Sequence, residues 1–210
     1  NFSHTYADGS ATPTIIVAAT DEDGTFVLGS KSLTVSNVAP SATLGGNAST
    51  NEGAIYTLNI LGSDPAGAND ALSYSIDWGD GSAPTALTAV QLAALGGNVS
   101  HVFADDQDGP VNATDRTIAV TVSDEDGGSS TQNKTVTVNN VAPDLTASGA
   151  TSGIAGSLYT LALANYIDPG QDTLLANGIS IDWGDGSAVQ NVSSLGDVTH
   201  TFAERTDVLH

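Results

Sequence analysis

The sequence predicts an all-β chain made of antiparallel β-sandwiches, and three observations support this fold class. Short apolar runs alternate with clusters of Gly, Asp, Asn and Pro, the arrangement expected of short strands joined by turns. Several runs alternate apolar and polar residues with the period of two that a half-buried strand requires. Only 13% of the 210 residues are charged, so Ser, Thr, Asn, Gly and Ala must cover much of the surface.

The stretch from residue 41 to residue 143 is expected to form one complete sandwich. The run 88–95 is rich in helix formers but only about two turns long, so it is expected to be a turn within a loop. The candidate strands are 41–44, 55–61, 72–78, 99–103, 117–123 and 135–140.

The alternation within these strands predicts which side chains form the core. Tyr74, Ile76 and Trp78 alternate with polar residues, so they are expected to share the face that points into the sandwich. The fifth strand repeats the pattern, and Ile118 and Val120 are expected to face inward.

Several short motifs recur along the chain at spacings of 97 to 105 residues. The heptapeptide IDWGDGS occurs at residues 76–82 and again at residues 181–187. Because a fixed period indicates a repeat architecture, we expect sandwiches in tandem with loops of variable length. The other recurring motifs are TDEDG and SDEDG, SNVAP and NNVAP, and a His-x-aromatic triplet that begins at His4, His101 and His200.

The phase of these motifs predicts three parts. Residues 1–40 match the second half of a repeat, residues 41–143 form a complete repeat, and residues 144–210 match the first half of another. The chain contains no Met and opens inside a motif, so we expect it to be a fragment of a longer protein. The alternative is that the flanking halves find their complements in neighbouring copies.

The charge balance excludes several classes of partner. The 24 acidic residues and four basic residues give a net charge of -20, which argues against binding nucleic acid or an anionic membrane and favours cations. No run reaches the roughly 18 apolar residues of a membrane span. The absence of Cys excludes disulfides and thiolate chemistry.

The order of these motifs resembles tandem PKD (polycystic kidney disease) domain repeats of prokaryotic extracellular and surface proteins. That order is IDWGDGS, His-x-aromatic, an apolar strand ending in SDEDGG, TVTV and an Asn-x-x-Pro junction. The family signature is close to Trp-Asp-Phe-Gly-Asp-Gly-Ser; here Ile76 and Ile181 take the Trp position, and Trp78 and Trp183 take the Phe position. The resemblance implies tandem immunoglobulin-like (PKD-type) β-sandwiches of roughly 100 residues each.

The repeated heptapeptide has a catalytic and a structural interpretation. Asp77 and Asp80 could in principle act as the acid and nucleophile of a glycosidase. The structural interpretation is preferred, because Gly79 and Gly81 permit a tight turn and Asp80 can accept hydrogen bonds from that turn's amides. The recurring histidines are expected to bond to neighbouring turns, so no catalytic residue and no enzyme activity are expected.

The resemblance also implies that three acidic segments meet at one end of each sandwich: the loop between the second and third strands, the loop between the last two strands, and the chain that enters the first strand. Carboxylates in Gly-rich loops suit calcium, and some PKD domains bind it through such a cluster. The alternative is that these are solvated hairpin turns whose aspartates form Asx-turns. The candidate ligands are Asn37, Asp64, Asp70, Asp124 and Asp126 in the complete repeat, and Asn140, Asp168 and Asp172 in the last part.

The leading functional prediction is a non-catalytic module, a spacer or stalk of an extracellular or cell-surface protein, stiffened by calcium. Its partners would be neighbouring repeats and surface glycans or proteins. One alternative is a self-assembling extracellular filament or surface layer with strand exchange between copies. Another is an accessory binding domain of a secreted hydrolase, for which Tyr159 and Tyr166 are the candidate exposed aromatics.

Overall fold

The computed structural model describes residues 1–106 and 112–203, which fall into two compact units. The predicted division at residues 40 and 143 stays a prediction. In the described part of the chain, no helix is long and apolar enough to span a bilayer. Unit 1 comprises Asn1–Thr50, Ile55–Phe103 and Thr114–Val138, and unit 2 comprises Asn51–Ala54, Ala104–Ala113 and Asn139–His210.

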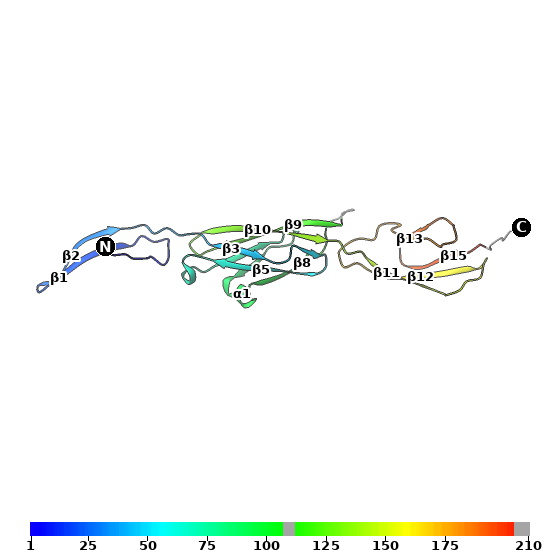
Figure 1. Ribbon diagram of the computed structural model, residues 1–210, viewed down its shortest axis with the longest axis horizontal. Coiled ribbons are helices and arrows are strands. Elements are labelled where there is room, and N and C mark those ends of the chain that lie inside the picture. The colour runs from blue at the N-terminus through cyan, green and yellow to red at the C-terminus, as the bar shows by residue number, and fades with distance from the viewer. Residues whose placement is uncertain (107–111, 204–210) are drawn as a thin grey trace. The chain divides into compact units, whose positions relative to one another are not determined.

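Unit 1 contains a hairpin and a two-sheet sandwich (Figure 1). The hairpin pairs β1 (Thr14–Asp21) with β2 (Gly24–Ser32). One sheet of the sandwich has the order β3-β5-β8 and the other the order β4-β10-β9-β6-β7, which confirms the all-β, immunoglobulin-like fold class. The strands are β3 Ser41–Gly45, β4 Ser49–Asn51, β5 Ile55–Ser63, β6 Ser73–Asp77, β7 Thr85–Thr88, β8 Asn98–Val102, β9 Ala113–Ser123 and β10 Ser129–Asn139.

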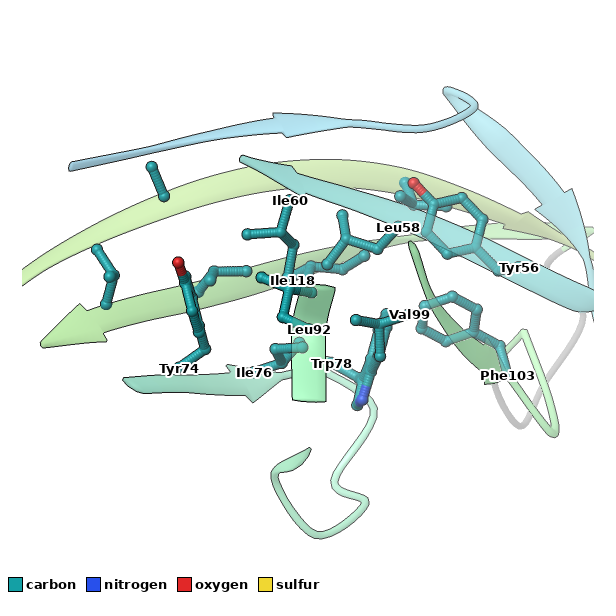
Figure 2. Packing of buried hydrophobic residues seen from close by; sticks show 14 of the residues in the cluster. Tyr56, Leu58, Ile60, Tyr74, Ile76, Trp78, Leu92, Val99, Phe103 and Ile118 are labelled. Atoms are coloured by element: carbon teal, nitrogen blue, oxygen red, sulfur yellow. The ribbon is translucent and has the colours of Figure 1, made fainter. Parts of the chain in front are cut away.

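The core of unit 1 lies between these two sheets, as Figure 2 shows. The three residues predicted to face inward from the third strand, Tyr74, Ile76 and Trp78, are 5%, 0% and 1% exposed. Ile118 and Val120 are fully buried on the same pattern. Each fully buried side chain of this kind contributes about 1.5–3 kcal/mol, so alternation alone identifies much of what holds the sandwich together.

One local prediction was wrong. The run 88–95 is not a turn in a loop but contains the helix α1 (Ala89–Ala94). Thr88 and Gln91 form a capping box: the Thr88 Oγ1 accepts from the Gln91 amide at 3.2 Å, and the Gln91 Oε1 accepts from the Thr88 amide at 2.8 Å. Leu92 then anchors the helix in the core, which offsets its short length.

Unit 2 repeats part of this strand pairing. Its three-stranded sheet has the order β11-β12-β15, and β13 pairs with β14. Leu163, Ile179, Ile181 and Val198 form its core, and the half-buried Trp183 packs against them. The strands are β11 Asp144–Gly149, β12 Leu158–Ile167, β13 Ile179–Ile181, β14 Gln190–Val192 and β15 Gly196–Thr201.

Candidate metal centre

The carboxylates of the repeated heptapeptide are engaged in a turn. The Asp77 Oδ1 accepts from the Gly79 amide at 2.9 Å, and the Asp80 Oδ1 accepts from the Ser82 amide at 3.0 Å. Gly79 and Gly81 have φ angles of 75° and 82°, which side-chain-bearing residues rarely adopt. The predicted tight turn, with Asp80 accepting from one of its amides, is therefore confirmed.

The other oxygen of Asp80 holds a histidine against the core. The His101 Nε2 lies 2.7 Å from the Asp80 Oδ2, and the imidazole stacks on the Trp78 indole with ring centroids 4.3 Å apart and 6° between planes. Burial acts to raise the pKa of Asp80, but hydrogen bonds from Ser82 and His101 outweigh it and hold that pKa below its usual range. His101 is thus a turn partner, as predicted.

The same arrangement occurs in unit 2. His200 lies 2.8 Å from the Asp185 Oδ2 and stacks on Trp183, with centroids 4.7 Å apart. Hydrogen bonds from Ser187 and then from His200 lower the pKa of Asp185. In both copies the second aspartate of the heptapeptide thus joins a turn to the histidine that stacks on the tryptophan.

The candidate ligands of the complete repeat come together at one end of the sandwich. Asp64 lies just after β5, Asp70 follows a 3₁₀ turn (Gly67–Asn69), and Asp124 lies just after β9. One carboxylate oxygen from each of these three lies within 4.8 Å of the others. The Asn37 Nδ2 donates to the Asp124 Oδ2 at 2.8 Å, so the chain segment that enters the sandwich reaches the same place.

The loops are shaped by their own side chains. The Asp64 Oδ1 accepts from the Ala66 amide at 2.7 Å, and the Asp124 Oδ1 accepts from the Gly128 amide at 2.7 Å. A Cβ atom on Gly128 would collide with the Asp124 carboxylate and lie 2.8 Å from the Asn37 Nδ2. Glycine at this position therefore allows Asn37 and Asp124 to approach each other.

Asp70 is the buried carboxylate of the cluster, and other acidic side chains surround it. Its side chain is 4% exposed, and neither carboxylate oxygen has a hydrogen-bond partner among the described residues. Burial, followed by the charges on Asp8 and Asp64, raises the pKa of Asp70 to about 6. A hard cation would favour the ionised carboxylate that this environment otherwise disfavours, and oxygen ligands of this kind suit calcium.

Asp126 lies in a second, overlapping group. One carboxylate oxygen each from Asp8, Asp70 and Asp126 lie within 4.8 Å of one another. The structure therefore gathers Asp64, Asp124 and Asp126 around Asp70, with Asn37 bonded to Asp124, and it adds Asp8, which was not among the predicted ligands.

The candidates of the last part are distributed differently. Asp172 lies within 4.8 Å of Glu52, Asp105 and Asp106, counting one carboxylate oxygen from each. Burial, followed by the charge on Glu52, raises the pKa of Asp172. Asp168 stands outside this group.

The remaining two candidates of the last part make their own contacts. Asp168 accepts hydrogen bonds from the Tyr166 hydroxyl at 3.2 Å and the Gly170 amide at 3.2 Å. The Asn140 amide donates to the Asn112 carbonyl at 3.0 Å, and its side-chain oxygen is buried without a hydrogen-bond partner among the described residues.

Comparison with known families identifies the domain that holds Asp64, Asp70 and Asp124. A family model described as "PKD domain" matches residues 37–138. Residues 37–138 form a PKD domain. The chain is also similar to the PKD1 domain of Epp from Vibrio anguillarum, with 20% identity and a TM-score of 0.33, over 49% of this chain and 96% of that one. No curated protein matches the chain.

Four acidic residues of these clusters were missed by sequence reasoning: Asp8, Glu52, Asp105 and Asp106. Asp8 and Asp105 carry a signal, because each follows the aromatic residue of a His-x-aromatic motif by two positions. Glu52 carries none. It is 1% exposed because its Oε1 accepts from the Val141 amide at 2.6 Å and its Oε2 from the Asp106 amide at 3.1 Å, contacts that only the fold creates.

Proposed function

We propose that the chain is a non-catalytic extracellular or cell-surface module that acts as a spacer or stalk, and that calcium stiffens the entry to its PKD domain. Membership of the PKD family supports a non-catalytic immunoglobulin-like module. The engagement of the repeated carboxylates in turns and with histidine supports it further. The observation that carries the calcium part is the meeting of Asp64, Asp70 and Asp124 beside Asn37.

A cation at this position would join parts of the chain that are far apart in sequence. Calcium takes six to eight oxygen ligands, of which three carboxylates from two loops, β5–β6 and β9–β10, supply the charged share. Asn37 belongs to the segment that enters β3, and its amide already bonds to Asp124. Binding would therefore hold that segment against two loops, while Pro40 limits its backbone freedom.

Calorimetric titration and thermal unfolding of the full chain test this proposal. At a free calcium concentration of about 100 times Kd, binding to the folded state adds about 2.7 kcal/mol of stability. The melting midpoint of unit 1, followed by Trp78 fluorescence in a Trp183→Phe background, should rise by at least about 5 °C relative to chelator. Asp64→Asn should abolish most of the shift, and Asp23→Asn, an exposed hairpin aspartate outside the cluster, should retain it. An unchanged midpoint in wild type would refute the calcium role.

A second candidate function, assembly by strand exchange, is favoured by the exposed hairpin of unit 1. Ile15 and Val17 of β1 are 46% and 55% exposed, whereas Ile118 and Val120, which hold the corresponding places before the second DEDG motif, are fully buried in β9. The hairpin face is thus suited to pack on a sheet supplied by another copy. Sedimentation velocity should then show concentration-dependent association that Ile15→Thr with Val17→Thr weakens; a monodisperse monomer would contradict it.

The predicted aromatic platform of an accessory binding domain finds no support. Tyr159 and Tyr166 are both half-buried. The Tyr159 hydroxyl donates to the Ala150 carbonyl at 2.9 Å, and its ring packs edge-on against Trp183. Both hydroxyls are therefore engaged in internal hydrogen bonds.

A further inference from the structure

Asp8 precedes the matched PKD domain, yet it meets residues of that domain. One of its carboxylate oxygens lies within 4.8 Å of oxygens of Asp70 and Asp126. Asp8 and Asp126 are exposed at the surface, whereas Asp70 is buried beneath it.

The two acidic groups around Asp70 overlap at that residue alone. Asp64 and Asp124 form one group with it, and Asp8 and Asp126 form the other. The buried Asp70 carboxylate has two oxygens, neither of which accepts a hydrogen bond from a described residue. A carboxylate with two free oxygens can bridge two metal ions that lie about 3.5–4 Å apart.

We propose that a second divalent cation, of the calcium class, binds between Asp8, Asp70 and Asp126, with Asp70 bridging it to the first. This rests on the proposed function, because the first cation is the one held by Asp64, Asp70 and Asp124. The second cation makes a residue outside the PKD domain a ligand, so binding fastens residues 1–36 to that domain.

The backbone around Asp8 is held close to the site without any cation. A Cβ atom on Gly9 would lie 2.7 Å from the Asn37 nitrogen, so glycine lets the segment around Asp8 approach the segment that enters β3. The Ala7 carbonyl accepts from the Asn69 Nδ2 at 3.5 Å, next to Asp70 in sequence. Asp8 also lines a cavity of about 110 Å³ together with Asn37 and Asp64, so the segment around Asp8 packs beside the segment that enters β3.

A similar pairing of aspartates occurs in unit 2, which indicates that the position of Asp8 beside Asp70 is a feature of the repeat. Asp105 follows Phe103 as Asp8 follows Tyr6, and Asp172 occupies the place in the IDPGQD loop that Asp70 occupies in the first repeat. Asp105 and Asp172 again belong to one acidic group.

Calcium titration of the full chain by isothermal calorimetry tests the proposal, with Asp8→Asn as the variant and Asp23→Asn as the matched control. Both changes remove one negative charge from an exposed aspartate in residues 1–36. Asp8→Asn should bind one calcium ion fewer per chain than wild type, while Asp23→Asn should bind the wild-type number. Amide hydrogen exchange of residues 36–39 should slow with calcium in the control and much less in Asp8→Asn.

The outcomes separate this inference from the proposed function. If Asp8→Asn keeps the wild-type number of ions and affinities within about twofold, the second cation position is wrong and the first stands. If wild type binds no calcium, both are wrong. Near-ultraviolet circular dichroism from Trp78 verifies that each variant retains the packed core.

Discussion

Each tryptophan of the chain lies flat against a histidine that a turn aspartate holds in place. The Trp78–His101–Asp80 and Trp183–His200–Asp185 sets share this geometry, with interplanar angles of 6° and 9°. The aspartate therefore links the turn to the aromatic core through one imidazole. This explains why residues of the heptapeptide and the His-x-aromatic motif recur together.

The lowered pKa of Asp185 makes the stability of unit 2 depend on pH. The folded pKa lies below the ordinary value of about 3.9, so ionised Asp185 contributes stability above that value, and the contribution is lost as pH falls toward the folded pKa. The free energy of unfolding should therefore fall between about pH 5 and about pH 2.5. Urea titrations at a series of pH values, followed by Trp183 fluorescence in a Trp78→Phe background, measure the free energy of unfolding of unit 2.

Asp185→Asn should have a shallower pH dependence over the same range, because the group that gains a proton on unfolding is gone. Asp197→Asn, an exposed aspartate on β15, should keep the wild-type slope. A slope unchanged by Asp185→Asn would show that the hydrogen bonds from Ser187 and His200 do not stabilise the charged form.

Glu52 is a buried acceptor for two amides, and its removal should destabilise unit 2. Glu52→Ala leaves the Val141 and Asp106 amides without that acceptor, which we expect to cost about 2–4 kcal/mol in the free energy of unfolding. Asp197→Ala, an exposed control in the same unit, should change it by less than about 0.5 kcal/mol. Urea titrations compare the two, and equal effects would contradict the structural role of Glu52.

The cluster around Asp70 could be anticipated because motif order tells which loops share an end of a sandwich. The resemblance to PKD domains then indicated Asp64, Asp70 and Asp124 as the candidate ligands in those loops. The burial of Asp70 and the role of Glu52 could not be anticipated, because they depend on tertiary contacts between residues far apart in sequence. Asp8 was missed because its partners Asp70 and Asp126 lie more than half a repeat away.

At the scale of elements, alternation predicted the long core strands and failed for the short ones. β4 and β7, of three and four residues, are too short to show a period of two. β9 and β10 begin several residues before their predicted starts, because their first halves are polar and exposed or half-buried. α1 was misread because propensity over six residues is weak, whereas its Thr88 and Gln91 capping box was the stronger signal.

The two faces of β5 differ enough to give a matched pair of substitutions. Leu58 is 0% exposed in the core, whereas Leu61 on the same strand is 68% exposed. Leu58→Ala should lower the free energy of unfolding of unit 1 by about 2–5 kcal/mol, because it leaves a cavity among packed side chains. Leu61→Ala should change it by less than about 0.5 kcal/mol, and similar losses for both would contradict the sandwich core.

At the scale of the whole molecule, a net charge of -20 opposes the compact state through self-repulsion. Sodium chloride shortens the screening length from about 30 Å at 0.01 M to about 3 Å at 1 M. The melting midpoint, measured by calorimetry with chelator present, should therefore rise across that range. Choline chloride at equal ionic strength should raise it similarly; a rise with sodium alone would indicate ion binding instead of screening.

The pairing of β4 with β10 determines how the sandwich responds to tension on the chain. The Thr137 amide donates to the Ala48 carbonyl at 3.0 Å, and the Glu52 amide donates to the Asn139 carbonyl at 3.0 Å. Residue numbers increase in the same direction along the two paired strands, from Ala48 and Thr137 to Glu52 and Asn139, so the strands run parallel. β4 lies near the start of the sandwich in sequence, and β10 is its last strand. A pull on the flanking chain loads these hydrogen bonds in shear, and they must rupture together instead of unzipping one at a time.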